Sequence, residues 1–137
     1  MKKLFLLLLG VMLLVGCQPK SVTGETVTAV GGSYQNITSA ELNAMLKNKD
    51  FVLVNVHIPF AGNLANTDLS IPYDQITVPE NLSQLPDDKN AKIVLYCRSG
   101  RMSAIAAEVL VSQGYTNIWD LAGGMVDWEA AGFGLEK

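Results

Sequence analysis

From residue 34 onward, short apolar runs alternate with polar segments that are rich in turn-forming residues. Residues 51–56 and 93–96 are almost continuously apolar and contain the Val, Ile and aromatic side chains that favour β-strands. Such runs are typical of strands that are buried on both faces of a parallel sheet. Residues 117–120 are predicted to form a further strand.

Helical patterns lie between these strands. Residues 38–41, Thr-Ser-Ala-Glu, have the spacing of a capping box at the start of a helix. Ser103, a good N-cap residue, is predicted to open an alanine-rich helix that ends at Gly114. Residues 124–130 are predicted to form a last short helix. This order of strands and helices predicts an α/β fold, with a central, mainly parallel β-sheet and helices on both faces.

Residues 57–79 show no clear period and contain three prolines and Gly62. Pro and Gly interrupt regular structure, so this segment is predicted to be irregular. Its length is unusual for a loop, which indicates either one wall of a functional site or a short element that the pattern does not place. Residues 81–85 are predicted to form one or two helical turns.

The N-terminus has the pattern of an export signal. Lys2 and Lys3 precede an apolar run over residues 4–14, which is too short to span a membrane comfortably. Small residues then precede Cys17, and this arrangement resembles the lipobox of bacterial lipoproteins, where cleavage falls before a lipidated cysteine. We therefore expect residues 1–16 to be a signal peptide and Cys17 to anchor the protein on the extracytoplasmic side of a bacterial cell envelope. The alternative is an uncleaved signal anchor, with Cys17 an ordinary buried thiol.

The rest of the chain divides into a linker and one domain. Residues 17–33 are small and polar, which is typical of a flexible tether, although residues 27–30 could add an edge strand. The chain of 137 residues is long enough for one domain and not for two. Residues 34–137 are predicted to form that domain.

The charge balance argues against two classes of partner. The chain carries 10 Lys and Arg against 13 Asp and Glu, a formal net charge of −3. Loss of the two signal-peptide lysines leaves 8 basic against 13 acidic residues, a net charge of −5. Such a domain is unsuited to nucleic acid and to electrostatic binding of anionic lipid. We expect a monomer that contacts the membrane through its lipid anchor.

Neither a metal ion nor a cofactor is predicted. The acidic residues that could suggest a cation site have no spacing that matches a known binding loop, and solvated turns are their default role. These residues are Asp68, Asp74, Asp87 and Asp88.

The candidate catalytic residues lie where the predicted strand at 93–96 ends. Cys97 follows this strand directly, and a short loop leads from it to the predicted helix. Gly100 lets the loop curl, which turns backbone N–H groups inward beside the positive end of the helix dipole. Arg98 and Arg101 add formal charge. All three effects favour a thiolate, the nucleophilic form of cysteine, and the same pocket suits an anionic substrate.

The count of cysteines supports a catalytic role for this thiol. The chain has two cysteines, and lipidation of Cys17 would leave Cys97 without a disulfide partner. A lone thiol is unusual in an oxidising compartment, and catalysis is the obvious reason to keep one. A buried structural thiol is the alternative, but it does not explain why a strand end, a glycine, two arginines and a Ser coincide.

Two segments resemble signatures of one family. Tyr-Cys-Arg-Ser-Gly-Arg-Met-Ser at 96–103 is similar to the active-site loop of rhodanese-like sulfurtransferases. Leu-Ala-Gly-Gly-Met-Val-Asp-Trp at 121–128 resembles the Gly-Gly-x-x-x-Trp signature near the end of that domain. The resemblance implies that Cys97 attacks the sulfane sulfur of a donor such as thiosulfate, becomes a persulfide and passes the outer sulfur to a thiol or cyanide. It also implies substrate-binding roles for Arg98, Ser99, Gly100, Arg101, Met102 and Ser103.

Three departures from the family pattern bear on the pocket. Met102 stands where many relatives have an Arg, and it is either an apolar wall suited to a polysulfide or bulkier thiol, or a packing residue. Asn55 and His57 replace an Asp-x-Arg ion pair, so His57 is either a proton shuttle or a structural histidine. Residues 60–71 do not match the Gly-His-Ile-Pro-Gly-Ala-type segment of the family.

Other functions compete with sulfur transfer. A phosphatase or arsenate reductase uses a similar cradle, but it needs a longer loop and an Arg six positions after the Cys, where this chain has Ser103. A lipid-tethered sulfur or oxyanion carrier without turnover, or a binding module of the envelope, stays open because of Met102 and the missing ion pair. A thioredoxin-like role is disfavoured, since Gly100 stands where a resolving Cys would be.

Overall fold

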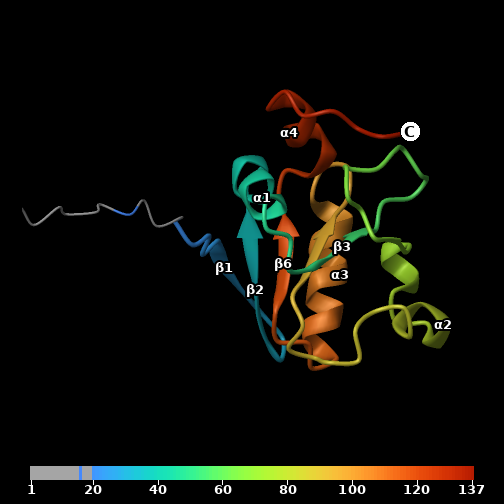
Figure 1. Cartoon of the computed structure of the whole chain (residues 1–137). Coiled ribbons are helices and arrows are strands. Elements are labelled where there is room, and N and C mark those ends of the chain that lie inside the picture. The colour runs from blue at the N-terminus through green and yellow to red at the C-terminus, as the bar shows by residue number, and fades with distance from the viewer. Residues whose placement is uncertain (1–15, 17–19) are drawn as a thin grey trace, which may run out of the picture.

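The structure is a computed structural model, and it describes Gly16 and residues 20–137. A six-stranded sheet forms the centre of the molecule, with helices on both faces (Figure 1). The strands are β1 Glu25–Ala29, β2 Gly32–Ile37, β3 Val52–Asn55, β4 Leu69–Ser70, β5 Ile93–Tyr96 and β6 Ile118–Leu121. The helices are α1 Ser39–Leu46, α2 Pro79–Leu82, α3 Arg101–Ser112 and α4 Gly124–Ala130, with a 3-10 turn, η1, at Tyr73–Gln75.

The export signal lies outside this description. Apart from Gly16, the predicted signal peptide is not among the described residues, and neither is Cys17. Within residues 20–137, none of the helices combines the length and the apolar character needed to cross a bilayer.

The sheet confirms the predicted fold class. The strand order is β1-β2-β6-β5-β3-β4; β1 is antiparallel to β2, and every other neighbouring pair is parallel. All four residues of β5 are buried, as the continuous apolar run predicted. Parallel strands end at one edge, so the segments that follow β3, β5 and β6 meet there.

The two faces of the sheet carry separate clusters of buried side chains. α3 packs on one face, over Ile93 and Leu95 of β5. α1 and α4 cover the other face, over Val94 and Tyr96. Because side chains alternate along a strand, Cys97 belongs to the face of α3, and it is buried in that cluster.

Part of the segment expected to be a flexible tether is structured. β1 and β2 form an antiparallel hairpin in which Ala29 pairs with Gly32 around a tight turn. Gly31 in that turn has a φ of +91°, a conformation that favours glycine. β1 thus forms an edge strand from Glu25 onward, in the region where residues 27–30 were considered as one. The alternation of exposed Thr and half-buried Val and Ala in β1 is the sequence signal for this strand.

α3 begins three residues earlier than predicted. Its N-cap is Gly100, not Ser103, and Ser103 is the third residue of the helix. Gly100 enters the helix with a φ of +98°, so its backbone freedom replaces side-chain capping. The predicted capping box at Thr38 and the helix over residues 124–130 are confirmed.

Candidate active site

Cys97 follows β5 directly and is buried, with 1% of the residue exposed. Its Sγ accepts a hydrogen bond from the backbone N–H of Gly100 at 3.0 Å and one from the Ser103 hydroxyl at 3.5 Å. The N-terminus of α3 lies at the same place, because the helix begins at Arg101. Hydrogen-bond donors and the positive end of a helix dipole stabilise a negative sulfur, so this geometry suits a nucleophilic thiolate.

The Gly-Gly segment before α4 holds the Cys97 loop in place. The backbone N–H groups of Met125 and Val126 donate to the carbonyl oxygens of Cys97 and Arg98, each at 3.0 Å. Gly124 makes this approach possible: its φ is +58°, and a Cβ there would lie 2.6 Å from the Arg98 carbonyl oxygen. The two family signatures therefore form one structural unit.

Gly100 is constrained in a similar way. A Cβ on Gly100 would lie 1.9 Å from the carbonyl oxygen of Ala122, the residue before the Gly-Gly segment. Its positive φ is also the conformation that places its N–H beside the Cys97 sulfur. The sequence suggested a flexible loop residue, and the structure adds a close backbone approach that only glycine permits.

The charged side chains of the loop lie at the surface. Arg98, Ser99 and Arg101 are all exposed. Within residues 20–137, neither arginine forms an ion pair, so both guanidinium groups are open to an approaching anion. The hydrogen bonds that Sγ receives from the described residues come from Gly100 and Ser103, not from a guanidinium.

Met102 and Ser103 point inward. Met102 is half-buried and packs against the cluster under α3, which agrees with a packing role. Ser103 is fully buried, and its hydroxyl lies 3.2 Å from the carbonyl oxygen of Gly100 as well as 3.5 Å from Cys97 Sγ. Its side chain is thus part of the sulfur environment.

A polar residue at the end of β3 holds the neighbouring loop by hydrogen bonds. Asn55 is buried; its Nδ2 donates to Gly62 O at 3.0 Å and to Asn63 Oδ1 at 2.9 Å, and its Oδ1 accepts from the His57 N–H at 3.0 Å. Burial, and then the positive charge of Arg98, lower the pKa of His57. The imidazole is therefore neutral at pH 7 and adds no charge to the site.

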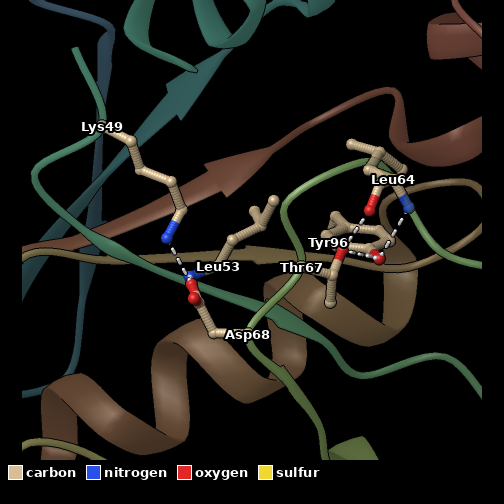
Figure 2. Close-up of polar contacts among 6 residues, drawn as sticks. All are labelled: Lys49, Leu53, Leu64, Thr67, Asp68 and Tyr96. Atoms are coloured by element: carbon tan, nitrogen blue, oxygen red, sulfur yellow. Dashed lines mark hydrogen bonds and ion pairs between the residues drawn. The ribbon is translucent and has the colours of Figure 1, made fainter. Parts of the chain in front are cut away.

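Tyr96, the residue before the nucleophile, anchors the same loop from the opposite face of the sheet (Figure 2). Its hydroxyl accepts a hydrogen bond from the Leu64 N–H at 3.1 Å and contacts Thr67 Oγ1 at 2.7 Å. The side chain thus ties the irregular segment after β3 to the strand that carries Cys97.

A second polar contact holds the far end of that segment (Figure 2). The carboxylate of Asp68 accepts a hydrogen bond from the Leu53 N–H at 2.7 Å and pairs with Lys49. The carboxylate of Asp68, one of the acidic residues considered above, therefore binds a backbone N–H group of β3. Across residues 20–137, no three His, Cys, Asp or Glu side chains are grouped as metal ligands would be.

Asp120 is a residue near the site that sequence reasoning missed as a functional candidate. It lies in β6, is 2% exposed, and its pKa is raised to about 6 by burial, with a hydrogen bond from Ser103 acting in the opposite direction. The available signal was an acidic residue in an otherwise apolar strand, Ile-Trp-Asp-Leu.

A surface hollow of about 510 Å³ lies away from the sulfur. It is found where β5 begins, at the opposite edge of the sheet, and its lining includes Met45, Lys47 and Lys92. Cys97 is not among the residues that line it; its Sγ is instead buried against the Gly100 N–H and the Ser103 hydroxyl.

Comparisons with known proteins agree with the two motifs. Residues 38–131 match the rhodanese-like domain. A sulfurtransferase of Allochromatium vinosum is 33% identical over 99 residues, which cover 70% of this chain and 89% of that protein. A tRNA uridine(34) hydroxylase of Erwinia tasmaniensis is 31% identical over 112 residues, 78% of this chain but only 31% of the hydroxylase. The chain thus spans about a third of the length of that relative.

The fold has close counterparts among solved structures. A rhodanese-related protein of Thermoplasma volcanium superposes with a TM-score of 0.62 at 30% sequence identity. The match covers 74% of this chain and 97% of the other.

Proposed function

Because the chain belongs to the family of rhodanese-like domains, we propose that it is a sulfurtransferase that carries sulfur as a persulfide on Cys97. The observation that carries this proposal is the pair of donors on Cys97 Sγ, the Gly100 N–H and the Ser103 hydroxyl, at the N-terminus of α3. This arrangement favours a negative sulfur in the attacking state and again in the leaving state.

In the first half-reaction, the Cys97 thiolate attacks the outer sulfur of thiosulfate or of a persulfide donor. The donor S–S bond breaks, and its electron pair leaves with sulfite or with a thiolate. Cys97 then carries one additional sulfur. Arg98 and Arg101 are exposed beside the sulfur and would attract the anionic portion of the donor.

In the second half-reaction, a thiol or cyanide attacks the outer sulfur, and the electron pair of the Cys97–sulfur bond returns to Sγ. Cys97 itself is buried, so the S–S bond of the persulfide affects how easily an acceptor reaches the sulfur. A persulfide carries the reactive atom about 2 Å beyond Sγ, so the acceptor attacks the outer sulfur and need not reach the buried Sγ itself.

A phosphatase-like alternative has less support. α3 begins at Arg101, four positions after Cys97, so three residues form the connecting loop. Ser103 at the sixth position is buried and contributes a hydroxyl, not a guanidinium. A ring this small offers few N–H groups to a tetrahedral oxyanion.

We also propose that Cys17 is lipidated and holds the domain on the outer side of a bacterial membrane, as a monomer that binds no nucleic acid. The sequence pattern of residues 1–17 and the acidic charge of the domain support this proposal. Mass spectrometry of the protein isolated from its own cell tests the lipidation, because the mass shows both cleavage before Cys17 and acylation of Cys17. An unmodified N-terminus, or a Cys17→Ala variant that fractionates like the wild type, would contradict it.

Steady-state turnover tests the enzymatic proposal. Thiocyanate formation from thiosulfate and cyanide should continue through many cycles in the wild type and in Asp87→Asn, which changes an exposed acid outside the site, and should be absent in Cys97→Ser. A single equivalent of sulfur per chain with no further cycling would support the carrier alternative. Hydrolysis of an aryl phosphate that is lost in Cys97→Ser would support the phosphatase instead.

A further inference from the structure

Two large apolar side chains are exposed in the segments on either side of the Cys97 loop. Phe60 is 61% exposed and Val126 is 49% exposed. A single apolar residue at a surface is common, but several beside one reactive atom indicate a surface that binds a partner. The strand order β6-β5-β3 fixes where the two side chains lie relative to the nucleophile.

Phe60 lies in the loop that follows β3, the strand next to the one that carries the nucleophile. The Val56 N–H donates to the carbonyl oxygen of Tyr96 at 2.9 Å, so the chain leaves β3 directly beside the end of β5. The Asn55 Nδ2 donates to the carbonyl oxygen of Gly62 at 3.0 Å, which brings the far end of the loop back to β3. Phe60 therefore lies near the tip of a closed loop at the carboxyl edge of the sheet.

Val126 lies on the other side of the nucleophile. It belongs to the first turn of α4, which follows β6, and its N–H donates to the carbonyl oxygen of Arg98 at 3.0 Å. Figure 1 shows α4 and the segment after β3 at the same end of the sheet. Neighbouring strands are about 4.8 Å apart and β5 lies between β3 and β6, so the two apolar flanks are about 10 Å apart, with the nucleophile between them.

Positive charge lies between these flanks. Arg98 and Arg101 are exposed, and neither forms an ion pair within residues 20–137. The domain around them is acidic, with 8 basic against 13 acidic residues after residue 16. We call Phe60, Val126 and the two arginines the sulfur rim. A ligand complementary to the sulfur rim combines apolar groups with negative charge.

The position of the two flanks favours a polypeptide over a small thiol. A small thiol carries its sulfur at one end, so it contacts only one flank while its sulfur reacts at Cys97. A cysteine within an extended polypeptide has neighbours on both sides. The residues two positions away point to the same side as the cysteine and lie about 7 Å before and after it, so their side chains reach both flanks.

We propose that the sulfur rim binds a segment of a partner protein in which a cysteine lies between apolar and acidic residues, and that this cysteine is the sulfur acceptor. Its thiolate attacks the outer sulfur of the Cys97 persulfide. The bond between that sulfur and Sγ breaks, its electron pair returns to Sγ, and the partner leaves as the persulfide. This inference rests on the proposed function for the transfer of sulfur, whereas docking of the segment does not depend on it.

Thiol–disulfide exchange tests the docking without a sulfur donor. The full chain is mixed with the peptide Asp-Leu-Ser-Cys-Ser-Leu-Asp, whose cysteine carries a 2-thiopyridyl group through a disulfide. The Cys97 thiolate attacks the cysteine sulfur, the thiopyridine leaves, and mass spectrometry of a digest separates the adduct on Cys97 from one on Cys17. The wild type should react about tenfold more slowly with Asp-Ser-Ser-Cys-Ser-Ser-Asp, since this peptide buries no apolar side chain against the rim.

Variants of the two flanks test which residues cause the preference. Phe60→Ala and Val126→Ala should each lower the ratio of the two rates, and the variant with both changes should bring it to about one. Val30→Ala is the matched control: Val30 is 86% exposed in the turn between β1 and β2, at the opposite edge of the sheet (Figure 1), so the ratio should stay at the wild-type value. Because the ratio is taken within each variant, a general change in Cys97 reactivity cancels.

A third peptide tests the charge. Lys-Leu-Ser-Cys-Ser-Leu-Lys should react about fivefold more slowly than the acidic peptide at low salt, and the difference should shrink as salt is added. Replacement of both Arg98 and Arg101 by Ala should remove the difference. A basic peptide that reacts as fast as the acidic one at low salt would contradict the acidic character assigned to the partner.

The outcomes separate this inference from the proposed function. Equal rates with the leucine and serine peptides in the wild type, or a preference that survives the change of both Phe60 and Val126 to Ala, overturns the docking proposal. A preference for the leucine peptide in a protein that takes up no sulfur would overturn the proposed function alone. Equal rates in a protein that does take up sulfur would overturn the docking alone.

Discussion

Gly124 lies against the carbonyl group of Arg98, so close that a Cβ at Gly124 would come within 2.6 Å of the carbonyl oxygen. The contact joins the start of α4 to the residue after the nucleophile. It explains why a Gly-Gly segment late in the chain bears on sulfur chemistry: the carbonyl groups of Cys97 and Arg98 are held by the backbone of the α4 turn. The orientation of the loop N–H groups therefore depends on a residue that never touches the substrate.

Gly124→Ala is expected to displace the Cys97 loop and to slow sulfur loading by about tenfold or more, since small displacements at a reacting atom are costly. Gly132→Ala is the matched control: Gly132 also has a positive φ, of +90°, but its Cβ would meet open space. Both variants carry the backbone strain, and only Gly124→Ala carries the clash. The measurement is the rate at which Cys97 takes up sulfur in a single turnover, followed by mass. Equal rates in the two variants would show that the contact between Gly124 and Arg98 does not position the Cys97 loop.

Replacement of both Arg98 and Arg101 by Ala should raise KM for thiosulfate by about fivefold at low salt, the scale expected for exposed charges. Added salt should raise the wild-type KM and narrow the difference, because it screens the guanidinium groups. Lys47→Ala removes an exposed charge at the opposite edge of the sheet and should leave KM unchanged. A double variant with the wild-type KM and salt dependence would show that the arginines do not recruit the donor.

Asp120 should make the folded protein less stable as pH rises. The pKa of its carboxyl group is about 6 in the folded protein, whereas the ordinary value for an exposed Asp, as in the unfolded chain, is 3.8. The folded state therefore binds this proton more tightly than the unfolded state does. The free energy of unfolding therefore falls between about pH 4 and pH 6 and then levels off. The total loss corresponds to about 3 kcal/mol, at 1.36 kcal/mol per pKa unit.

Asp120→Asn should remove this loss and stabilise the protein at pH 7 more than at pH 4. Denaturant unfolding at the two pH values is the measurement, with Asp87→Asn as the control. If Asp120→Asn lowers the free energy of unfolding equally at pH 4 and pH 7, the prediction is wrong, and the Asp120 side chain stabilises the fold at both pH values.

The sheet and its central strand could be predicted because local patterns specify them. Continuous apolar runs predicted β3 and β5, and the Thr-x-x-Glu spacing predicted the start of α1. The hairpin of β1 and β2 was harder, because an edge strand with small, polar residues resembles a linker until its partner is known. The start of α3 was predicted too late because Ser is a common N-cap residue. The positive φ of Gly100, which starts the helix earlier, cannot be predicted from the identity of the residue.

The site was only partly accessible from sequence. Cys97 and its loop are contiguous, so their chemistry could be inferred from neighbours along the chain. The contact between Gly124 and Arg98 joins residues that are distant in sequence, and so does the hydrogen bond from the Leu64 N–H to the Tyr96 hydroxyl. Both depend on strand order and register, which a pattern of apolar positions does not specify.

The mass of the Cys97 peptide after treatment with thiosulfate is the most direct test of the central claim, that Cys97 carries the transferred sulfur. We predict a gain of one sulfur atom, about 32 Da, that disappears on addition of cyanide and is absent in Cys97→Ser. A folded wild-type protein whose Cys97 gains no sulfur from thiosulfate, a persulfide or a polysulfide would contradict the account.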